Sequence, residues 1–378
     1  MDVDVTASAY LDHNAGSPPR PEVVAAVAEV LCEAGNPSSV HAWGRRARAR
    51  MEAARAAVAR LLDADPAGLV FTSGGTEANA LALAGCRRPR ILVSAVEHAS
   101  VLVHATGTVP VDGDGRVDLA ALDRMLADGG DPAVVSVMLA NNETGVIQPV
   151  ADVAAVAHAH GALVHCDAAQ APGRMALSLS GLGVDFLTLS AHKLGGLPGA
   201  GALLSADPDF TLTPVLPGGG QERRRRAGTE NLPGIVGFGV AADDIRRRNA
   251  ILETGDLRDR LEARAQALVP AARIVGRSAP RLCNTSCIAL PGVPASVQVM
   301  ALDLAGVMVS AGAACSSGRV TESAVLRAMG LAADIAGSAI RVSLGPDSRP
   351  AEIELFLTHW AELARRKGLD VKEAAQAA

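Results

Sequence analysis

One lysine stands apart in a chain whose cations are otherwise arginine. The 378 residues include 35 Lys and Arg together, and only three of these are lysine, namely Lys193, Lys367 and Lys372. Two of them lie near the end of the sequence, so Lys193 is alone in its body. A primary amine can lose its proton and form an imine with an aldehyde, whereas a guanidinium cannot. The count alone leaves an ordinary surface lysine equally open, so the neighbouring residues must decide.

Two polar turns could accompany this amine. Residues 72–79, Thr-Ser-Gly-Gly-Thr-Glu-Ala-Asn, follow an apolar run and open a helix, whose free N–H groups favour an anion such as phosphate. Asp167 ends another apolar run, where a buried carboxylate needs a cationic partner such as a protonated ring nitrogen. Together with Lys193 in Ser190-Ala191-His192-Lys193, these residues suit an aldehyde cofactor. A plain strand-to-helix turn and a helix-capping Asp are the structural alternatives.

A cysteine, Cys315, lies in a loop of small residues from 311 to 318. Glycine and serine in such a loop allow a thiolate to be exposed, whereas Cys166 and Cys287 lie in apolar, strand-like contexts typical of inert core thiols. A loop cysteine can also be incidental. Cys283 and Cys287 form a Cys-x3-Cys pair, but no second Cys or His pair with ligand spacing lies nearby, and we predict no metal site.

These residues need a scaffold that brings several strand ends together. Short apolar runs alternate with helical patterns, which predicts an α/β fold with a mostly parallel sheet covered by helices. In such a sheet, ligands bind at the carboxyl ends of the strands. The predicted strands of this sheet are residues 69–71, 91–93, 133–139, 162–165, 186–189 and 201–204.

The composition narrows the class of protein. Hydrophobic residues make up 49% of the chain, which is enough for a large core and excludes disorder over most of its length. No apolar stretch is long enough to span a bilayer, the start does not resemble a signal peptide, and the net charge of −5 gives no general attraction to nucleic acid or membranes. We therefore expect a cytoplasmic protein that binds neither nucleic acid nor membranes. The run Arg223–Arg226 lacks interleaved aromatic residues, which favours a phosphate-proximal or subunit-interface loop.

The ordered set of motifs resembles the class V aminotransferase group, and within it the cysteine desulfurases of the NifS/IscS type. The resemblance extends over nearly the whole chain. Its motifs are residues 11–15, 35–41, 72–79, 97–98, 141–145, 167–170, 190–193, 218–223, 226–231 and 310–318.

The resemblance implies a fold-type I enzyme that depends on pyridoxal 5'-phosphate. It implies a large domain at 15–250 with a seven-stranded type of sheet, and a smaller α+β domain formed by 1–14 and 251–378, which carries the catalytic cysteine loop at about 311–322. It further implies a homodimer that takes sulfur from L-cysteine, releases L-alanine and passes a Cys315 persulfide to an acceptor protein, such as an iron–sulfur scaffold or a tRNA-thiolation carrier.

Residue roles follow from the same resemblance. Lys193 would bond covalently to the cofactor, Asp167 would pair with the ring nitrogen and Gln170 with the phenolic oxygen. His98 would stack on the ring and could shuttle protons. The remaining residues would hold the phosphate (Gly75, Thr76, Ser190 and His192, with Thr229 from the other subunit), the cofactor and substrate (Asn142) and the substrate alone (Asn36 and Arg341).

One departure from the family pattern and three rival functions remain open. Gly16-Ser17 replaces a Thr-Thr pair near the expected substrate mouth, which leaves the substrate preference undecided. The rivals are a selenocysteine lyase, another class V enzyme in which Cys315 is dispensable, and a cysteine-based metal-binding scaffold.

Overall fold

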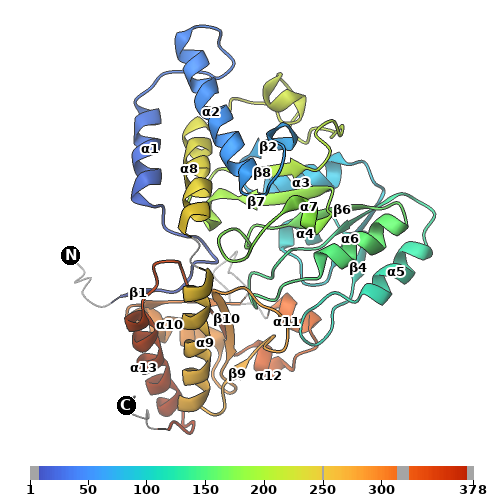
Figure 1. Cartoon of the computed structure of the whole chain (residues 1–378). Helices are drawn as coiled ribbons and strands as arrows, with labels where there is room; N and C mark the ends of the chain where they lie inside the picture. The colour runs from blue at the N-terminus through green and yellow to red at the C-terminus, as the bar shows by residue number, and fades with distance from the viewer. Residues whose placement is uncertain (1–7, 249–250, 313–322, 373–378) are drawn as a thin grey trace.

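The computed structural model describes residues 8–248, 251–312 and 323–372, which form two lobes (Figure 1). The larger lobe is built on a seven-stranded sheet, and the smaller one on a four-stranded and a two-stranded sheet. Cys315 lies outside the described residues.

The seven-stranded sheet has the order β2-β8-β7-β6-β5-β3-β4. Strand β8 is antiparallel to both of its neighbours, and the other pairings are parallel. The sequence predicts six of these strands, and the short β4 is the one it misses. Their bounds are β2 Leu69–Thr72, β3 Arg90–Ser94, β4 Gly107–Val109, β5 Ala133–Ser136, β6 Leu163–Asp167, β7 Phe186–Ser190 and β8 Gly201–Ser205.

Helices cover this sheet because each presents an Ala-, Leu- or Val-rich stripe to it. Helices α1, α2 and α8 pack together in one layer, while α5 and α6 lie side by side in another part of the lobe (Figure 1). The strands between them are buried on both faces, as their continuous apolar runs predict. The helices are α1 Pro21–Leu31, α2 Ala42–Arg60, α3 Gly75–Gly85, α4 Ala99–Leu102, α5 Leu119–Ala127, α6 Val150–Ala159, α7 Leu179–Leu182 and α8 Leu232–Arg248.

The smaller lobe joins the start of the chain to its last third. Strand β1 pairs with β11, and the antiparallel sheet has the order β12-β13-β10-β9. One hydrophobic cluster draws on residues 9–11 and 261–364, separate from the cluster of residues 23–242 in the larger lobe. The elements are β1 Ala9–Tyr10, α9 Ile251–Leu268, β9 Arg273–Ile274, β10 Thr285–Ala289, α10 Ala295–Leu304, β11 Val307–Met308, β12 Ser310–Ala311, α11 Ala324–Ala328, α12 Ala333–Ala336, β13 Ala339–Ser343 and α13 Pro350–Arg366.

The predicted fold class is confirmed, because a mostly parallel sheet flanked by helices is joined to a smaller α+β lobe. The domain boundaries at 15–250 and 251–378 stay a prediction. Within the described residues, no helix is both long and apolar enough to cross a membrane.

Candidate active site

A cavity of about 230 Å³ lies at the edge of the seven-stranded sheet where its parallel strands end, and is called here the sheet-edge cavity. Ten of the predicted site residues line it, from both lobes. They are Gly75, Thr76, His98, Asn142, Asp167, Gln170, Ser190, His192, Lys193 and Arg341.

Two other predicted site residues lie elsewhere. Asn36 is exposed, and its side-chain oxygen accepts a hydrogen bond from the Ser38 N–H at 2.8 Å. Thr229 is exposed on the loop before α8, which leaves open its predicted role toward another subunit. Neither residue lines the sheet-edge cavity.

One end of the cavity is built to receive an anion. No side chain caps the N-terminus of α3, where Gly75 and Thr76 line the cavity. Free N–H groups and the helix dipole at such a terminus attract negative charge. Ser190 Oγ lies 3.0 Å from His192 Nδ1, and burial lowers the pKa of His192 to about 4, so this imidazole is neutral near pH 7.

Asp167 ends β6 and supplies a buried carboxylate, as predicted. Its Oδ1 accepts from the Ala169 N–H at 3.0 Å, and its Oδ2 accepts from Asn79 Nδ2 at 2.8 Å. No Lys, Arg or His of the described residues forms an ion pair with it. A cationic ring nitrogen in the cavity would therefore meet a carboxylate that is fixed in place and has no ionic partner.

Lys193 follows β7 in a short 3₁₀ turn, and its amine is held by backbone oxygens. Nζ donates to the carbonyl of Asn14 at 2.6 Å and to that of Ala15 at 2.9 Å. Burial, followed by the nearby charges of Arg341 and Arg174, lowers the pKa of Lys193 to about 8. A sizeable fraction of this amine is therefore neutral near pH 8, as attack on an aldehyde requires.

The predicted substrate-binding arginine is already part of an ion pair. Arg341 lies on β13 and is 2% exposed. One guanidinium nitrogen contacts Asp12 Oδ1 at 2.6 Å, another donates to the Asn142 carbonyl at 3.1 Å, and Nε has no hydrogen-bond partner. A substrate carboxylate would have a free N–H donor here, but it would compete with Asp12 for the cation.

His98 caps the short helix α4 as well as lining the cavity. Its Nδ1 accepts from the Ser100 N–H at 3.1 Å, which requires the unprotonated form of that nitrogen. Glu97, the preceding residue, is buried and accepts from the Met138 N–H at 2.6 Å. Burial, together with the charge of Asp167, raises the pKa of Glu97 well above its usual range.

Sequence reasoning missed the side chains that support the predicted ones. Asn79 Nδ2 holds both Asp167 and Ser100 Oγ. Its position was readable, because it lies one helical turn after Gly75 and so shares a face of α3 with it. Asp12 and Asn14 belong to the motif at residues 11–15. The hydrogen-bond partners of their side chains are more than 120 residues away, and no local pattern indicates such contacts.

The Ser17 side chain lies against the lysine turn. Ser17 Oγ donates to the Lys193 carbonyl at 3.1 Å, and the Ser17 N–H donates to the His192 carbonyl at 2.9 Å. A Cβ on Gly16 would lie 3.7 Å from the His192 ring, which is ordinary contact. The departure from the family pattern at these two residues therefore falls on a segment that packs against the turn carrying the amine.

The arginine-rich loop folds back on the anion end. Arg226 Nε donates to Glu77 Oε1 at 2.8 Å, and Glu77 lies in the first turn of α3. This contact agrees with the phosphate-proximal position expected for the run.

The cysteine-based metal scaffold finds no donor set in the described part of the chain. No group of three or more His, Cys, Asp or Glu side chains converges there. Cys283 and Cys287 are free thiols, and burial raises the pKa of Cys287 to about 12, as expected of an inert core thiol.

The donor set fits pyridoxal phosphate. The uncapped start of α3 suits the phosphate, Asp167 suits the ring nitrogen, and Lys193 suits the aldehyde. The three features line one cavity, and they follow or end the strands β2, β6 and β7.

The chain is similar to known proteins over most of its length. The sequence profile described as Aminotransferase class-V matches residues 9–356. A cysteine desulfurase of Cereibacter sphaeroides is 44% identical, covering 92% of this chain and 93% of its own, and an IscS-like cysteine desulfurase of Mycobacterium tuberculosis is 38% identical, covering 92% and 94%. The crystal structure of a NifS-like protein from Rickettsia africae is 33% identical, with a TM-score of 0.88 over 95% of this chain and all of its own.

Proposed function

Because this chain belongs to the aminotransferase class-V family, we propose that it is a pyridoxal-phosphate-dependent cysteine desulfurase that converts L-cysteine to L-alanine. The observation that carries the proposal is the convergence of Lys193, Asp167 and the uncapped start of α3 on the sheet-edge cavity. The likeness to enzymes named cysteine desulfurase supplies the substrate.

The cofactor, when bound, supplies an aldehyde for the amine and a ring that withdraws electrons from an attached substrate. Asp167 would hold the ring nitrogen, Gln170 the phenolic oxygen, and the start of α3 with Ser190 the phosphate. His98 would lie against the ring.

The protein's own groups would bind the substrate and move its proton. Arg341 and Asn142 would hold the carboxylate of L-cysteine, and Asp12 would compete with that carboxylate for Arg341. Lys193 Nζ would accept the Cα proton, because its pKa of about 8 lets it act as both base and acid near neutral pH.

Cys315 would take the sulfur. Its thiolate attacks the substrate sulfur, a sulfur–sulfur bond forms, and the carbon–sulfur bond of the substrate breaks with its electron pair left on carbon. Protonation of that carbon completes alanine, so one cysteine and one enzyme thiol give one alanine and one persulfide. The persulfide would pass to an acceptor protein, such as an iron–sulfur scaffold or a tRNA-thiolation carrier. We also propose a cytoplasmic homodimer in which Thr229 reaches the phosphate of the partner's site.

Absorbance tests the cofactor. We expect the purified protein to show a band near the wavelength of a protonated imine, alone or after addition of pyridoxal phosphate. Borohydride reduction should fix the cofactor on wild type but not on Lys193→Ala. Absence of the band, or a reducible adduct on Lys193→Ala, would contradict this part of the proposal.

Product analysis tests the sulfur step. Cys315→Ala should abolish alanine formation from L-cysteine, whereas Cys32→Ala, at an exposed thiol, should leave it intact. Full activity of Cys315→Ala would exclude the persulfide route. Turnover of L-selenocysteine alone would favour a selenocysteine lyase.

A further inference from the structure

Arg174 is a buried cation just behind the proposed cofactor site. It is 7% exposed, it does not line the sheet-edge cavity, and no carboxylate among the described residues forms an ion pair with it. An unpaired buried charge is costly unless other groups satisfy it. Its guanidinium donates instead to oxygens of three separate segments: the Gln170 carbonyl at 3.2 Å, Gln170 Oε1, the His13 carbonyl at 2.9 Å and the Lys193 carbonyl at 3.3 Å.

The contact with Gln170 decides which end of its amide faces the site. A guanidinium can only donate, so it must meet Oε1 and not the amide nitrogen. Gln170 Nε2 then points the other way, where it donates to the Asn14 carbonyl at 3.1 Å. An amide nitrogen carries two hydrogens, so a second donor remains at a residue that lines the sheet-edge cavity.

The contact of Arg174 with the Lys193 carbonyl affects the same group of hydrogen bonds around Asn14. Lys193 Nζ shares the Asn14 carbonyl with Gln170 Nε2, and the Lys193 carbonyl is held by both Arg174 and Ser17. Removing the guanidinium would therefore remove a hydrogen bond from the Gln170 amide, from the Lys193 carbonyl and from the His13 carbonyl at the same time.

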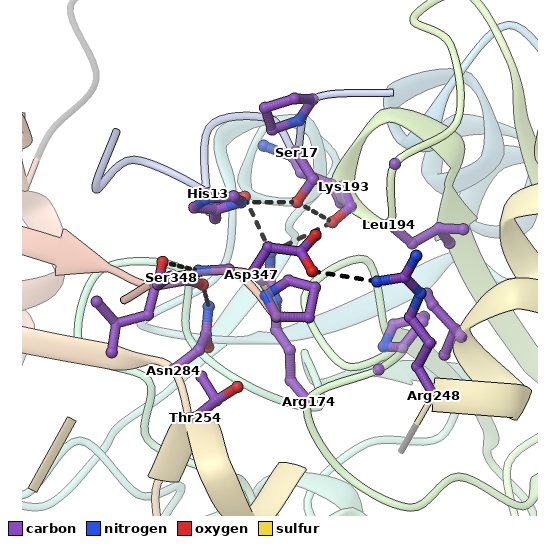
Figure 2. Close-up of a pocket in the computed structure, with 18 of the residues that line it drawn as sticks. His13, Ser17, Arg174, Lys193, Leu194, Arg248, Thr254, Asn284, Asp347 and Ser348 are labelled. Atoms are coloured by element: carbon purple, nitrogen blue, oxygen red, sulfur yellow. Dashed lines mark hydrogen bonds and ion pairs between the residues drawn. The ribbon is translucent and has the colours of Figure 1, made fainter. Parts of the chain in front are cut away.

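A second cavity, of about 300 Å³, lies on the far side of Lys193 between the two lobes, and is called here the inter-lobe cavity. Figure 2 shows the Arg174 side chain reaching through it toward His13 and Lys193. Its rim includes the exposed Asp347, which pairs with Arg248 at 3.1 Å. A small cation could therefore enter where the Arg174 side chain had been removed.

We infer that Arg174 is a positioning residue for the proposed reaction: it orients the Gln170 amide and holds the Lys193 turn against the His13–Ser17 segment. The catalytic significance of this role rests on the proposed function, but the contacts themselves can be tested without the cofactor.

The test measures Lys193 reactivity in cofactor-free protein. Pulsed acylation across pH 6–11, read by peptide mass spectrometry, has Lys367 and Lys372 as internal references in the same chain. We expect the Lys193 midpoint to move to higher pH in Arg174→Ala, because a neighbouring positive charge and part of the burial are lost, so that labelling at pH 8 falls several-fold. Methylguanidinium should restore the profile, and Arg248→Ala, at another arginine that lines the inter-lobe cavity, should not change it.

A second variant keeps the inference testable if Arg174→Ala does not fold. Gln170→Glu keeps an acceptor for Arg174 but loses the donor to the Asn14 carbonyl, whereas Gln170→Leu loses both, so Gln170→Glu should unfold at a higher urea concentration than Gln170→Leu. A midpoint for Gln170→Glu at or below that of Gln170→Leu would overturn the inference, as would an unchanged Lys193 profile in folded Arg174→Ala. Failure of the protein to bind pyridoxal phosphate would instead count against the proposed function alone.

Discussion

At the scale of single residues, the chemistry depends on an amine that the fold keeps partly unprotonated. Lys193 has neutral oxygens as its hydrogen-bond partners and two arginines nearby, which together with burial bring its pKa to about 8 from 10.5. Between these values the unfolded chain binds a proton that the folded chain has lost. The free energy of unfolding due to this residue therefore rises with pH over that range and is lowest below pH 8.

We expect Lys193→Met to stabilise the cofactor-free protein relative to wild type at pH 7, by about 3 kcal/mol at most. The difference should shrink as the pH rises from 8 toward 10.5, because the wild-type amine no longer carries a buried charge. Urea unfolding of both proteins at several pH values measures it. Lys367→Met, at an exposed lysine, is the control. A difference that does not vary with pH would contradict the low pKa.

The sequence points to the reacting residues more readily than to their supports. Lys193 and Asp167 are identifiable because each comes at the end of an apolar run, where a charged side chain calls for a functional explanation. Arg174 is not, and for Asn79 only its place on the face of α3 can be read from the sequence, since the contacts of both residues are with residues far along the chain. No single-chain pattern encodes which carbonyl a buried guanidinium will meet.

At the scale of elements, the anion end depends on the close approach of two strands. Gly201 begins β8, and it pairs with Thr72 at the end of β2 and with Ser190 at the end of β7. A Cβ at Gly201 would lie 2.6 Å from the Gly74 backbone, just before α3. The apolar pattern predicts β8 but not its antiparallel direction, on which this contact depends.

We expect Gly201→Ala to weaken binding of pyridoxal phosphate about tenfold or more, equivalent to about 1.4 kcal/mol. The new methyl group must displace the Gly74 turn and with it the start of α3. Absorbance titration measures the affinity. Gly113→Ala places its methyl group in open space and should bind as wild type does. Equal affinities for both variants would exclude the turn as the phosphate site.

A buried ion pair fixes the arginine-rich loop to helix α2 and strand β2. Arg55 on α2 contacts Glu222 at 2.7 and 2.9 Å, and Glu222 also accepts from the Phe71 N–H. Residues 222–224 all have positive φ, which is strained for side chains other than glycine. The ion pair therefore holds a conformation that the loop would not adopt alone.

We expect Arg55→Met to lower the free energy of unfolding by about 3–5 kcal/mol, because it leaves a buried carboxylate unpaired. Adding Glu222→Gln should recover part of that loss. Arg60→Met, on the same helix, breaks an exposed pair with Asp243 and should cost less than about 1 kcal/mol. Urea denaturation compares the variants, and equal losses for Arg55 and Arg60 would refute the argument.

At the scale of the whole molecule, the contacts between the two lobes include a buried asparagine and exposed ion pairs. Asn14 is 1% exposed and donates to the Asn142 carbonyl in the larger lobe and to Thr285 Oγ1 in the smaller one. Asp347 is exposed and links Arg20 and Arg248. The sequence predicts two lobes from a change in pattern, but not the contacts that join them.

We expect Asn14→Ala to cost about 1–3 kcal/mol, because it leaves buried polar partners unsatisfied, whereas Asp347→Ala should cost less than about 1 kcal/mol. Trp360 is fully buried in the smaller lobe, so its fluorescence in a Trp43→Phe background reports on that lobe. In Asn14→Ala its unfolding transition should separate from that of circular dichroism. Coincident transitions with an unchanged midpoint would disprove the role of Asn14.

The antiparallel β8 also bears on how fast the site can work. Residues 191–200, which include Lys193, connect β7 to β8, and a hydrogen bond from the Ala191 N–H to the Ala200 carbonyl closes this connection. Because both of its ends are fixed in one sheet, we expect the amine to move by rotation about its own side-chain bonds. Such rotations take picoseconds to nanoseconds when a side chain is free to move, whereas loop closures take microseconds or longer. Solvent viscosity should therefore have little influence on the lysine step.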